Sequence, residues 1–271
     1  MPSPTQITPA QLSRLIGTPD APVILDVILN EDFALAPRLI PTASRQNHLT
    51  IAEQAPSLKG KKVVVVCQKG FKISQGSAAI LRDHGVKAET LEGGNMGWQE
   101  AGLPTIPHAK IPEKNEEGRT VWVTRQRPKI DRIACPWLIR RFIDPMAQFL
   151  FVDASQVQNV AKNFGAIPFD IEDVPFSHKG ELCTFDTLLE TFELSIPALK
   201  HLAQIVRGAD TGRTDLAPES AGLLAASLGL SRMFRDDLEQ LEAGLTLYDA
   251  FYRWARDATS ETHTWSGETM K

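Results

Sequence analysis

Residues 63–74 read Val63-Val-Val-Val-Cys67-Gln-Lys-Gly70-Phe-Lys72-Ile-Ser74, and this stretch decides the fold of the N-terminal part of the chain. Four consecutive valines are typical of a strand buried in a parallel sheet. A short loop with a glycine follows, and residues 74–84 have helical spacing that ends at Gly85. A strand that leads through a tight loop into a helix is the repeating unit of an α/β fold.

Two further apolar runs extend this pattern on either side. Residues 23–27 and 88–91 have the composition of buried parallel strands. We therefore predict that residues 1–106 form an α/β domain with a parallel sheet and helices on both faces.

The composition changes after residue 106. Residues 107–119 contain two prolines, a glycine and many charged groups, and are typical of a linker. For residues 120–271 we predict an α+β, largely helical second domain. Its expected strands are residues 120–124 and 149–152, and its expected helices are residues 182–192, 197–208, 218–227 and 231–257.

The composition of the 271 residues is that of a globular protein with a net charge of −4. The longest aliphatic run is residues 63–66, so no membrane span is expected. The first five residues lack the basic and apolar regions of a signal peptide, and we expect the cytoplasm. The three cysteines lie far apart without a Cys-x-x-Cys pair, which excludes a disulfide framework and a zinc ribbon.

Cys67 is the strongest candidate for chemistry. It follows a buried strand and precedes a helix, at the edge of the sheet where ligands of open α/β folds bind. Loop N–H groups, the helix N-terminus and two lysines would all favour the nucleophilic thiolate. The alternative is a buried structural cysteine. The residues expected to hold the substrate are Gln68, Lys69, Gly70, Phe71, Lys72 and Ser74.

The stretch of residues 63–98 resembles a rhodanese domain. The matching pieces are the Val-Val-Val-Val-Cys67-Gln-Lys-Gly segment, Ser77-Ala-Ala-Ile-Leu-Arg-Asp-His-Gly and Leu91-Glu-Gly-Gly-Asn-Met-Gly-Trp98. The resemblance implies that Cys67 accepts sulfur from a small-molecule donor as a persulfide and passes it to a thiol acceptor such as glutathione. The distance from Cys67 to Lys72 matches the family's loop, with lysine where arginine is usual. A related phosphatase-type loop is one residue longer and ends in arginine, so loop length favours sulfur over phosphate.

An arginine-rich strip opens the second domain. Seven basic residues and one acid, Asp131, lie within residues 119–142. Guanidinium forks suit oxyanions, but the strip could equally be a solvated face that forms ion pairs with the acidic C-terminal helix. Few aromatics and no recognition-helix pattern accompany it, so no nucleic-acid surface is expected. The oxyanion-binding candidates are Arg125, Arg132, Arg140 and Arg141.

A second group of candidate residues consists of His178, Cys183 and Asp186, which are all possible metal ligands. A helix that began near Glu181 would place the last two on one face, with His178 reaching over from the preceding loop. This set could hold zinc or a redox metal, with His201 and Asp210 as distal ligands, or its members could be structural. A transition metal here is the one cofactor that the sequence suggests, since no flavin or nicotinamide fingerprint is present.

Cys135 has two interpretations of its own. If Pro136 were the first residue of a helix, Cys135 would be the N-cap, near the positive end of the helix dipole. The alternative is a packing cysteine beside Trp137.

Residues 120–256 resemble the chromate-resistance (ChrB-type) C-terminal domain. The resemblance rests on long segments from Thr124 to Phe142, from Phe176 to Asp186, from Ile205 to Thr211 and from Ala217 to Leu224. It implies a role in handling chromate or a related oxyanion, or a metal stress.

The sequence therefore predicts a rhodanese-type sulfurtransferase that acts through Cys67 and carries an oxyanion- or metal-binding domain of chromate resistance. Two alternatives remain open at this point. One is a non-enzymatic chromate or metal sensor with the rhodanese unit as a scaffold, and the other is a thiol-dependent chromate reductase.

Overall fold

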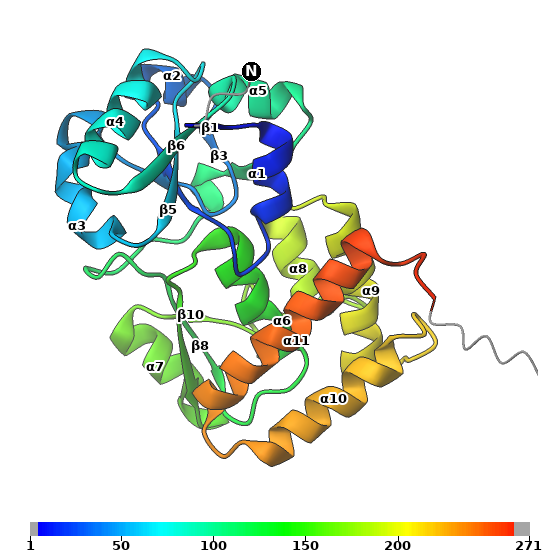
Figure 1. The fold of residues 1–271 in the computed structure, drawn as a ribbon. Coiled ribbons are helices and arrows are strands. Elements are labelled where there is room, and N and C mark those ends of the chain that lie inside the picture. The colour runs from blue at the N-terminus through cyan, green and yellow to red at the C-terminus, as the bar shows by residue number, and fades with distance from the viewer. Residues whose placement is uncertain (1–4, 263–271) are drawn as a thin grey trace, which may run out of the picture.

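The computed structural model describes residues 5–262. In Figure 1 the N-terminal domain, in blue to teal, lies at the upper left, and the second domain, in green to red, lies below and to the right of it. Helix α11 (Asp237–Asp257) runs along the second domain towards helix α1 (Pro9–Leu15) of the first.

A five-stranded parallel sheet forms the centre of the first domain, as predicted. Its strand order is β1-β6-β5-β2-β4, and each neighbouring pair is parallel. A short antiparallel pair, β3 with β7, lies outside it. The strands are β1 (Gln6–Ile7), β2 (Val23–Asp26), β3 (Arg38–Leu39), β4 (Ser44–Arg45), β5 (Lys62–Val66), β6 (Lys87–Leu91) and β7 (Ile106–Pro107).

Helices cover both faces of this sheet because the buried strand β5 has two apolar sides. Val63 and Val65 belong to the core that includes Ala78 and Leu81 of α4. Val64 and Val66 belong to the opposite core, with Leu12 of α1 and Trp98 of α5. Successive side chains of a strand point to opposite faces, so the run of valines serves two layers. Of these helices, α4 spans Lys72–Asp83 and α5 spans Gly94–Glu100; the other two α-helices of this domain after α1 are α2 (Asn30–Leu35) and α3 (Ala55–Leu58).

The second domain is built on a smaller parallel sheet. Its order is β10-β8-β9, with α7 packed on one side through Val123 and Val157. Trp122 and Phe149 face the main core on the other side. The strand expected at residues 120–124 is therefore buried on both faces rather than half-buried. The elements are β8 (Val121–Arg125), β9 (Gln148–Val152), β10 (Ile167–Pro168) and α7 (Val157–Phe164).

Five α-helices form the rest of the second domain, which confirms its largely helical character. They are α6 (Asp131–Leu138), α8 (Thr184–Thr191), α9 (Pro197–Asp210), α10 (Ser220–Met233) and α11. The break expected at residues 228–230 was wrong, since α10 continues through Gly229. The chain turns instead before Asp236, whose carboxylate accepts hydrogen bonds from the N–H groups of Leu238 and Glu239 and caps α11.

Pro136 does not start a helix, contrary to the first of the two interpretations of Cys135. Helix α6 begins at Asp131, and Pro136 lies inside it. A proline inside a helix removes one N–H hydrogen bond, and its ring clashes with the preceding turn, so surrounding packing has to offset this cost. Here the flanking residues Cys135 and Trp137 are fully buried. Cys135 is therefore the packing cysteine of the second interpretation.

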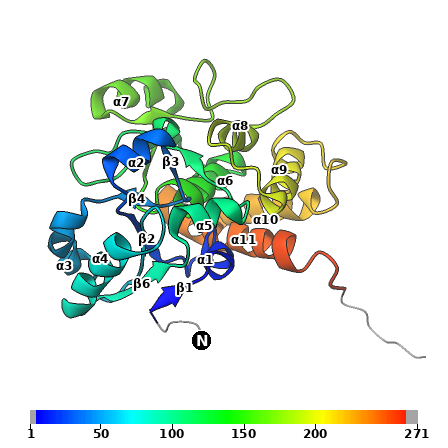
Figure 2. The same cartoon turned by 90° about the horizontal axis from the view of Figure 1, so that it is seen from above.

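The two domains share one continuous core. The core that holds Leu12 and Trp98 also holds Trp137 and Tyr252 of the second domain. The backbone N–H of Thr42 donates to the carbonyl of Phe142 at 2.9 Å across this contact. The view from above shows α1 and α5 lying over α6 and α11 (Figure 2). The domain borders at residues 106 and 120 stay predictions.

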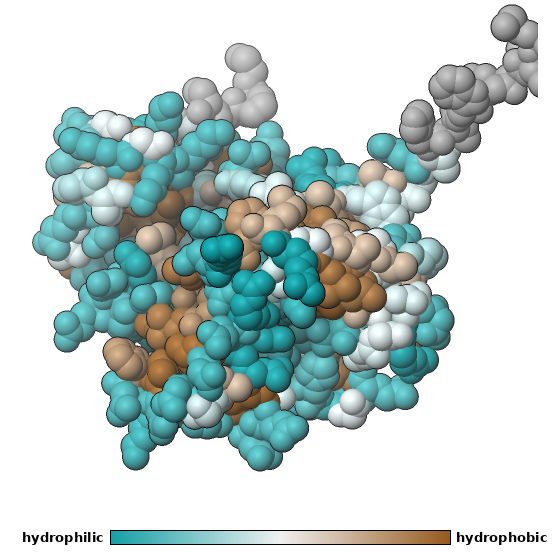
Figure 3. Space-filling view, turned by 90° about the horizontal axis from the view of Figure 1, so that it is seen from below, coloured by the Kyte–Doolittle hydropathy of each residue, from teal (hydrophilic) through white to brown (hydrophobic). Residues whose placement is uncertain are grey.

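The molecular surface on the face seen from below is mostly hydrophilic, with apolar patches between the polar areas (Figure 3). Within residues 5–262, no helix has the length and apolar character needed to cross a bilayer.

Candidate functional site

Cys67 lies directly after β5 and is 6% exposed. Its Sγ lies 3.1 Å from the hydroxyl of Ser74, in the first turn of α4. The Ser74 hydroxyl also contacts the carbonyl oxygen of Phe71 at 3.2 Å. A neutral thiol would therefore donate to Ser74, whereas a thiolate would accept from the same hydroxyl after it rotates. Ser74 can thus stabilise the charged form of Cys67.

The loop between Cys67 and α4 is held from behind by α5. The N–H groups of Asn95 and Met96 donate to the carbonyls of Cys67 and Gln68, at 2.9 and 3.0 Å. Gly94 makes this approach possible, because a Cβ atom there would lie 2.2 Å from the Cys67 carbonyl oxygen. The glycines of the 91–98 segment thus fix the shape of the cysteine loop.

The front of the loop faces solvent and is positively charged. Lys69 and Lys72 are exposed, and Phe71 is 64% exposed. In the described part of the chain, no N–H group of residues 68–71 donates a hydrogen bond to a protein oxygen. Free amides at the start of a helix form an anion site. All the substrate-binding residues expected from the sequence lie on this loop or on the first turn of α4, and their role in binding stays a prediction.

A buried carboxylate stands on the neighbouring strand. Asp26 pairs in register with Val66, the residue before Cys67. Its Oδ1 accepts hydrogen bonds from the N–H of Ile28 and from Arg45 Nη1, at 3.0 and 2.9 Å. Burial raises the pKa of Asp26, while Ile28 and Arg45 lower it. Arg45, which the sequence did not indicate, thus keeps this end of β2 ordered.

The four oxyanion-binding candidates of the arginine strip divide between two places. Arg140 pairs with Glu242, and Arg141 makes a bidentate contact with Asp249 at 2.8 Å, both on α11. This is the arrangement expected of a face that pairs with the acidic C-terminal helix. Arg125 and Arg132 instead approach Asp170 Oδ2, at 3.6 and 3.3 Å. Binding of an oxyanion by these arginines stays a prediction.

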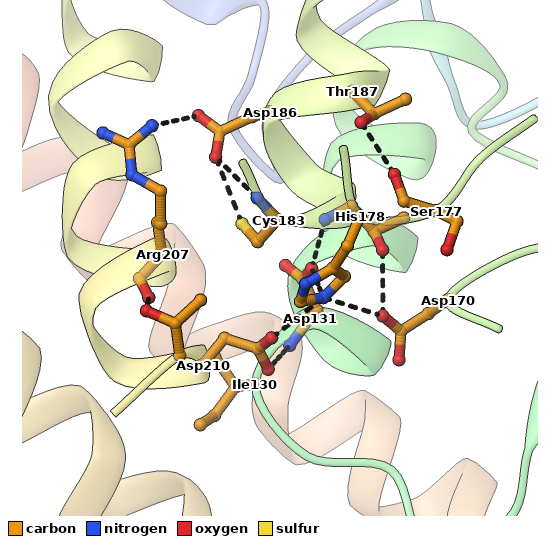
Figure 4. Close-up of polar contacts among 12 residues, drawn as sticks. Ile130, Asp131, Asp170, Ser177, His178, Cys183, Asp186, Thr187, Arg207 and Asp210 are labelled. Carbon is orange, nitrogen blue, oxygen red and sulfur yellow. Dashed lines mark hydrogen bonds and ion pairs between the residues drawn. The ribbon is translucent and has the colours of Figure 1, made fainter. Parts of the chain in front are cut away.

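Three carboxylates surround His178 (Figure 4). His178 Nε2 lies 3.2 Å from Asp210 Oδ2 and 3.5 Å from both Asp131 Oδ2 and Asp170 Oδ1. Asp131 begins α6, Asp210 ends α9, and Asp170 and His178 come from the long segment between β10 and α8. Three segments that are far apart in the sequence thus meet at one imidazole.

The electrostatics of this cluster are unusual. Hydrogen bonds with Asp131 and then Asp170 raise the pKa of His178 to about 10, and they outweigh its partial burial. Burial, followed by repulsion from Asp131, raises the pKa of Asp210 to about 7. Burial also raises the pKa of Asp131, which is fully enclosed. Perturbed groups of this kind gather at functional sites.

Cys183 and Asp186 lie in a separate arrangement at the start of α8. Cys183 is the N-cap, and Asp186 Oδ2 accepts from its backbone N–H at 3.1 Å and from its Sγ at 3.3 Å. The other oxygen, Oδ1, contacts Arg207 at 3.3 Å. Burial raises the pKa of the Cys183 thiol. The structure therefore pairs Cys183 with Asp186, and it surrounds His178 with other carboxylates.

Of the three carboxylates around His178, the sequence indicated Asp210 as a ligand and did not indicate Asp131 or Asp170. Asp131 stood out only as the single acid among seven basic residues, and Asp170 follows a short strand without any motif. Asp210 was expected as a distal ligand and does reach His178. His201, expected beside it, lies against the Trp254 ring at a centroid distance of 5.2 Å instead.

Comparison with known protein families assigns both halves of the chain. Residues 8–101 match the rhodanese-like domain, and residues 122–255 match the C-terminal domain of ChrB. Both family resemblances drawn from the sequence are thereby confirmed.

Three individual proteins are similar to parts of this chain. Protein ChrB of Cupriavidus metallidurans is 37% identical over 158 residues, which cover 55% of this chain and 46% of that protein. The chain thus spans about half the length of this relative. A rhodanese-like domain protein from Staphylococcus aureus is 29% identical, with a TM-score of 0.32, over 37% of this chain and 96% of that one. A thiosulfate sulfurtransferase from Pseudomonas aeruginosa is 25% identical, with the same TM-score, over 38% of this chain and 19% of that one.

Proposed function

We propose that this chain, which joins a rhodanese-like domain to a ChrB C-terminal domain, is a sulfurtransferase that carries sulfur as a persulfide on Cys67. The observation that carries the proposal is the position of the Cys67 thiol. It lies beneath a loop of uncommitted amides, in contact with the hydroxyl of Ser74. Such a position allows the loop amides to hold an anionic sulfur donor against the thiol.

In the first half of the reaction the Cys67 thiolate attacks the outer sulfur of a sulfane donor such as thiosulfate. A bond forms between Sγ and that sulfur, and the S–S bond of the donor breaks. Sulfite leaves with the electron pair of the broken bond. The amides of residues 68–71 and the charges of Lys69 and Lys72 stabilise the anion during this step.

In the second half an acceptor thiolate attacks the outer sulfur of the persulfide. The bond between this sulfur and Sγ breaks, and its electron pair restores the Cys67 thiolate. The acceptor leaves as a persulfide, so no external oxidant or reductant is consumed. The 64% exposed ring of Phe71 stands at the mouth of the loop, where it can contact the organic part of the acceptor.

Lys72 stands where an arginine fork would clamp a planar or tetrahedral oxyanion at two points. An ammonium group supplies charge without that geometry. We therefore expect thiosulfate to bind weakly, and Lys72→Arg to improve its use as a donor.

The second domain indicates the process in which this sulfur transfer takes part. We assign it a role in chromate resistance through binding of a metal or oxyanion, with the cytoplasm as its place of action. Cys135 and Cys183 are fully buried, and burial raises the pKa of each thiol. These two thiols are therefore poorly suited to supply electrons to chromate, so a thiol-dependent chromate reductase would have to act through Cys67.

Steady-state transfer of sulfur from thiosulfate to glutathione tests the proposal. Wild-type protein should show turnover, and Cys67→Ser should show none. Lys72→Gln should lower kcat/KM by about tenfold, as expected for the loss of one charged contact. Lys62→Gln removes an exposed lysine from the start of β5, the strand that leads to Cys67, and should leave kcat/KM unchanged.

A lack of Cys67-dependent turnover with thiosulfate and with organic persulfide donors would contradict the proposal. The N-terminal domain would then be a scaffold, and the protein a binding module or sensor.

A further inference from the structure

The His178 cluster has the composition of a cation site. One ligand atom from each of Asp131, Asp170 and His178 can be chosen so that all three lie within 4.8 Å of one another. Asp210 Oδ2 lies 3.2 Å from the same imidazole nitrogen. Three carboxylates thus contact the same imidazole (Figure 4).

Asp131 gives an independent reason to expect a bound cation in the His178 cluster. Its side chain is 0% exposed, and Oδ2 accepts a hydrogen bond of 2.6 Å from the N–H of Thr184. Its other oxygen, Oδ1, is buried and has no hydrogen-bond partner among the described residues. Buried carboxylate oxygens are normally paired or bound to a metal. The oxygen next to His178 is Oδ2, at 3.5 Å, so a cation that contacted both oxygens of this carboxylate would also satisfy Oδ1.

The charges around the cluster also favour a bound cation. Arg125 and Arg132 both approach the Oδ2 atom of Asp170, which leaves its Oδ1 towards His178. Among the ion pairs of residues 5–262, neither Asp131 nor Asp210 contacts a lysine or arginine. In the described residues, His178 is therefore the group that forms an ion pair with each of these two carboxylates.

We propose that Asp131, Asp170 and His178 bind one divalent first-row metal ion, with Asp210 as the adjacent fourth group. Carboxylate oxygens with one imidazole suit Mn²⁺ and Zn²⁺, and the absence of a thiolate disfavours Cu⁺. The ion would take the place of the proton that His178 Nε2 shares with the carboxylates. Thr184 orients the site from behind, because its N–H contacts Asp131 and its hydroxyl contacts Asp170 Oδ1 at 2.9 Å.

The site is open on one side. The His178 side chain is 41% exposed and that of Asp210 is 19% exposed, whereas Asp131 is enclosed. An ion can therefore enter past the imidazole and be held against the buried carboxylate. This ligand set shares His178 with the set predicted from the sequence, and it takes Asp131 and Asp170 in place of Cys183 and Asp186.

This inference rests on the proposed metal-binding role of the second domain and does not depend on the chemistry of Cys67. The full chain, freed of metal with a chelator and dialysed, would be titrated with Mn²⁺. The free ion would be followed by electron paramagnetic resonance, and Zn²⁺ would be tested by competition. We expect one Mn²⁺ per chain, displaced by Zn²⁺.

Two pairs of variants separate the two ligand sets. His178→Gln and Asp131→Asn should weaken Mn²⁺ binding by at least about tenfold. Cys183→Ser and Asp186→Asn should bind within about twofold of wild type, because their side chains pair with each other and with Arg207. His178 is at the surface, so its variant should fold even if Asp131→Asn does not.

Wild-type protein that binds no stoichiometric Mn²⁺ or Zn²⁺ would overturn the inference. Loss of binding in Cys183→Ser with retention in His178→Gln would overturn it as well. Cys67→Ser should bind Mn²⁺ like wild type, and metal-free protein should still load sulfur. Failure of the metal site and failure of sulfur transfer are thus distinguishable.

Discussion

The backbone of Gly94 lies against the carbonyl oxygen of Cys67, so that a Cβ atom at position 94 would lie 2.2 Å from that oxygen and 2.4 Å from the nitrogen of Gly70. Gly94 also has a φ of +59°, a conformation that side-chain-bearing residues rarely adopt. A glycine 27 positions beyond the cysteine therefore sets the shape of the loop in which the thiol lies.

Replacement of Gly94 by alanine should damage this loop. We expect Gly94→Ala to lower the free energy of unfolding by about 1–3 kcal/mol, because backbone atoms must move to admit the methyl group. Sulfur loading of Cys67 should fall with it. Urea unfolding and donor-dependent loading measure the two effects, and wild-type values for both would contradict the account of the loop.

Gly76 offers the matched control on the other side of the loop. It lies exposed in α4, and a Cβ atom there would meet nothing within 4 Å. Gly76→Ala should raise the free energy of unfolding by about 0.4–1 kcal/mol, since alanine restricts the unfolded chain and favours the helix. Its sulfur loading should equal that of wild type. A destabilised Gly76→Ala protein would mean that α4 is packed differently.

Ser74→Ala tests the hydroxyl that contacts the Cys67 thiol at 3.1 Å. Loss of a hydrogen bond to the thiolate should slow the reaction of Cys67 with a neutral alkylating agent by about tenfold. Stopped-flow alkylation at a fixed pH measures this rate. Ser77→Ala removes another buried hydroxyl of α4 and should leave the rate unaltered. Equal rates for the two variants would show that the Ser74 hydroxyl does not affect the reactivity of Cys67.

Asp144, in the second domain, should be a structural residue that holds the inter-domain segment in place. It is fully buried, and it accepts hydrogen bonds from the N–H and hydroxyl of Thr120 at 2.7 and 2.9 Å, with Lys114 Nζ at 3.3 Å. Asp144→Ala should lower the free energy of unfolding by about 3 kcal/mol, because these donors lose their acceptor. The exposed Glu116→Ala should change it by less than about 0.5 kcal/mol. A small effect of Asp144→Ala in chemical denaturation would contradict this role.

His178 should make the stability of the metal-free protein depend on pH. Its folded-state pKa is raised from 6.5 to about 10, so its contribution is fully present below pH 6.5 and is lost as the pH rises through about 10. The difference in unfolding free energy between wild type and His178→Gln should therefore shrink across this window. Denaturation curves from pH 6 to 10, with a chelator present, measure it. A difference that is constant with pH would show that the carboxylates do not hold the imidazolium.

Much of the fold follows from local pattern. The run of valines before Cys67 predicted a strand buried on both sides, and the alternation of such runs with helical spacing predicted the parallel sheet. Pro136 left the start of its helix open, because proline is common at the first position of a helix. The structure has α6 begin at Asp131, with the fully buried Cys135 and Trp137 on either side of the proline. The join of α10 and α11 was misplaced because Gly229 is tolerated in the helix and Asp236 supplies the cap.

The two sites differ in how far the sequence could predict them. The Cys67 loop is contiguous, so its residues were found from one stretch. The His178 cluster draws Asp131 from α6, Asp170 from the segment after β10 and Asp210 from the end of α9. Only the packing of these elements brings the carboxylates together, and no spacing along the chain indicates it.

The most direct test of the central claim is the intact mass of the protein after incubation with thiosulfate or another sulfane donor, for wild type and Cys67→Ser. The account predicts that wild type gains one sulfur atom, that a thiol acceptor removes it, and that Cys67→Ser gains none. A wild-type mass that stays unchanged with every donor, or a gain that persists in Cys67→Ser, would contradict it.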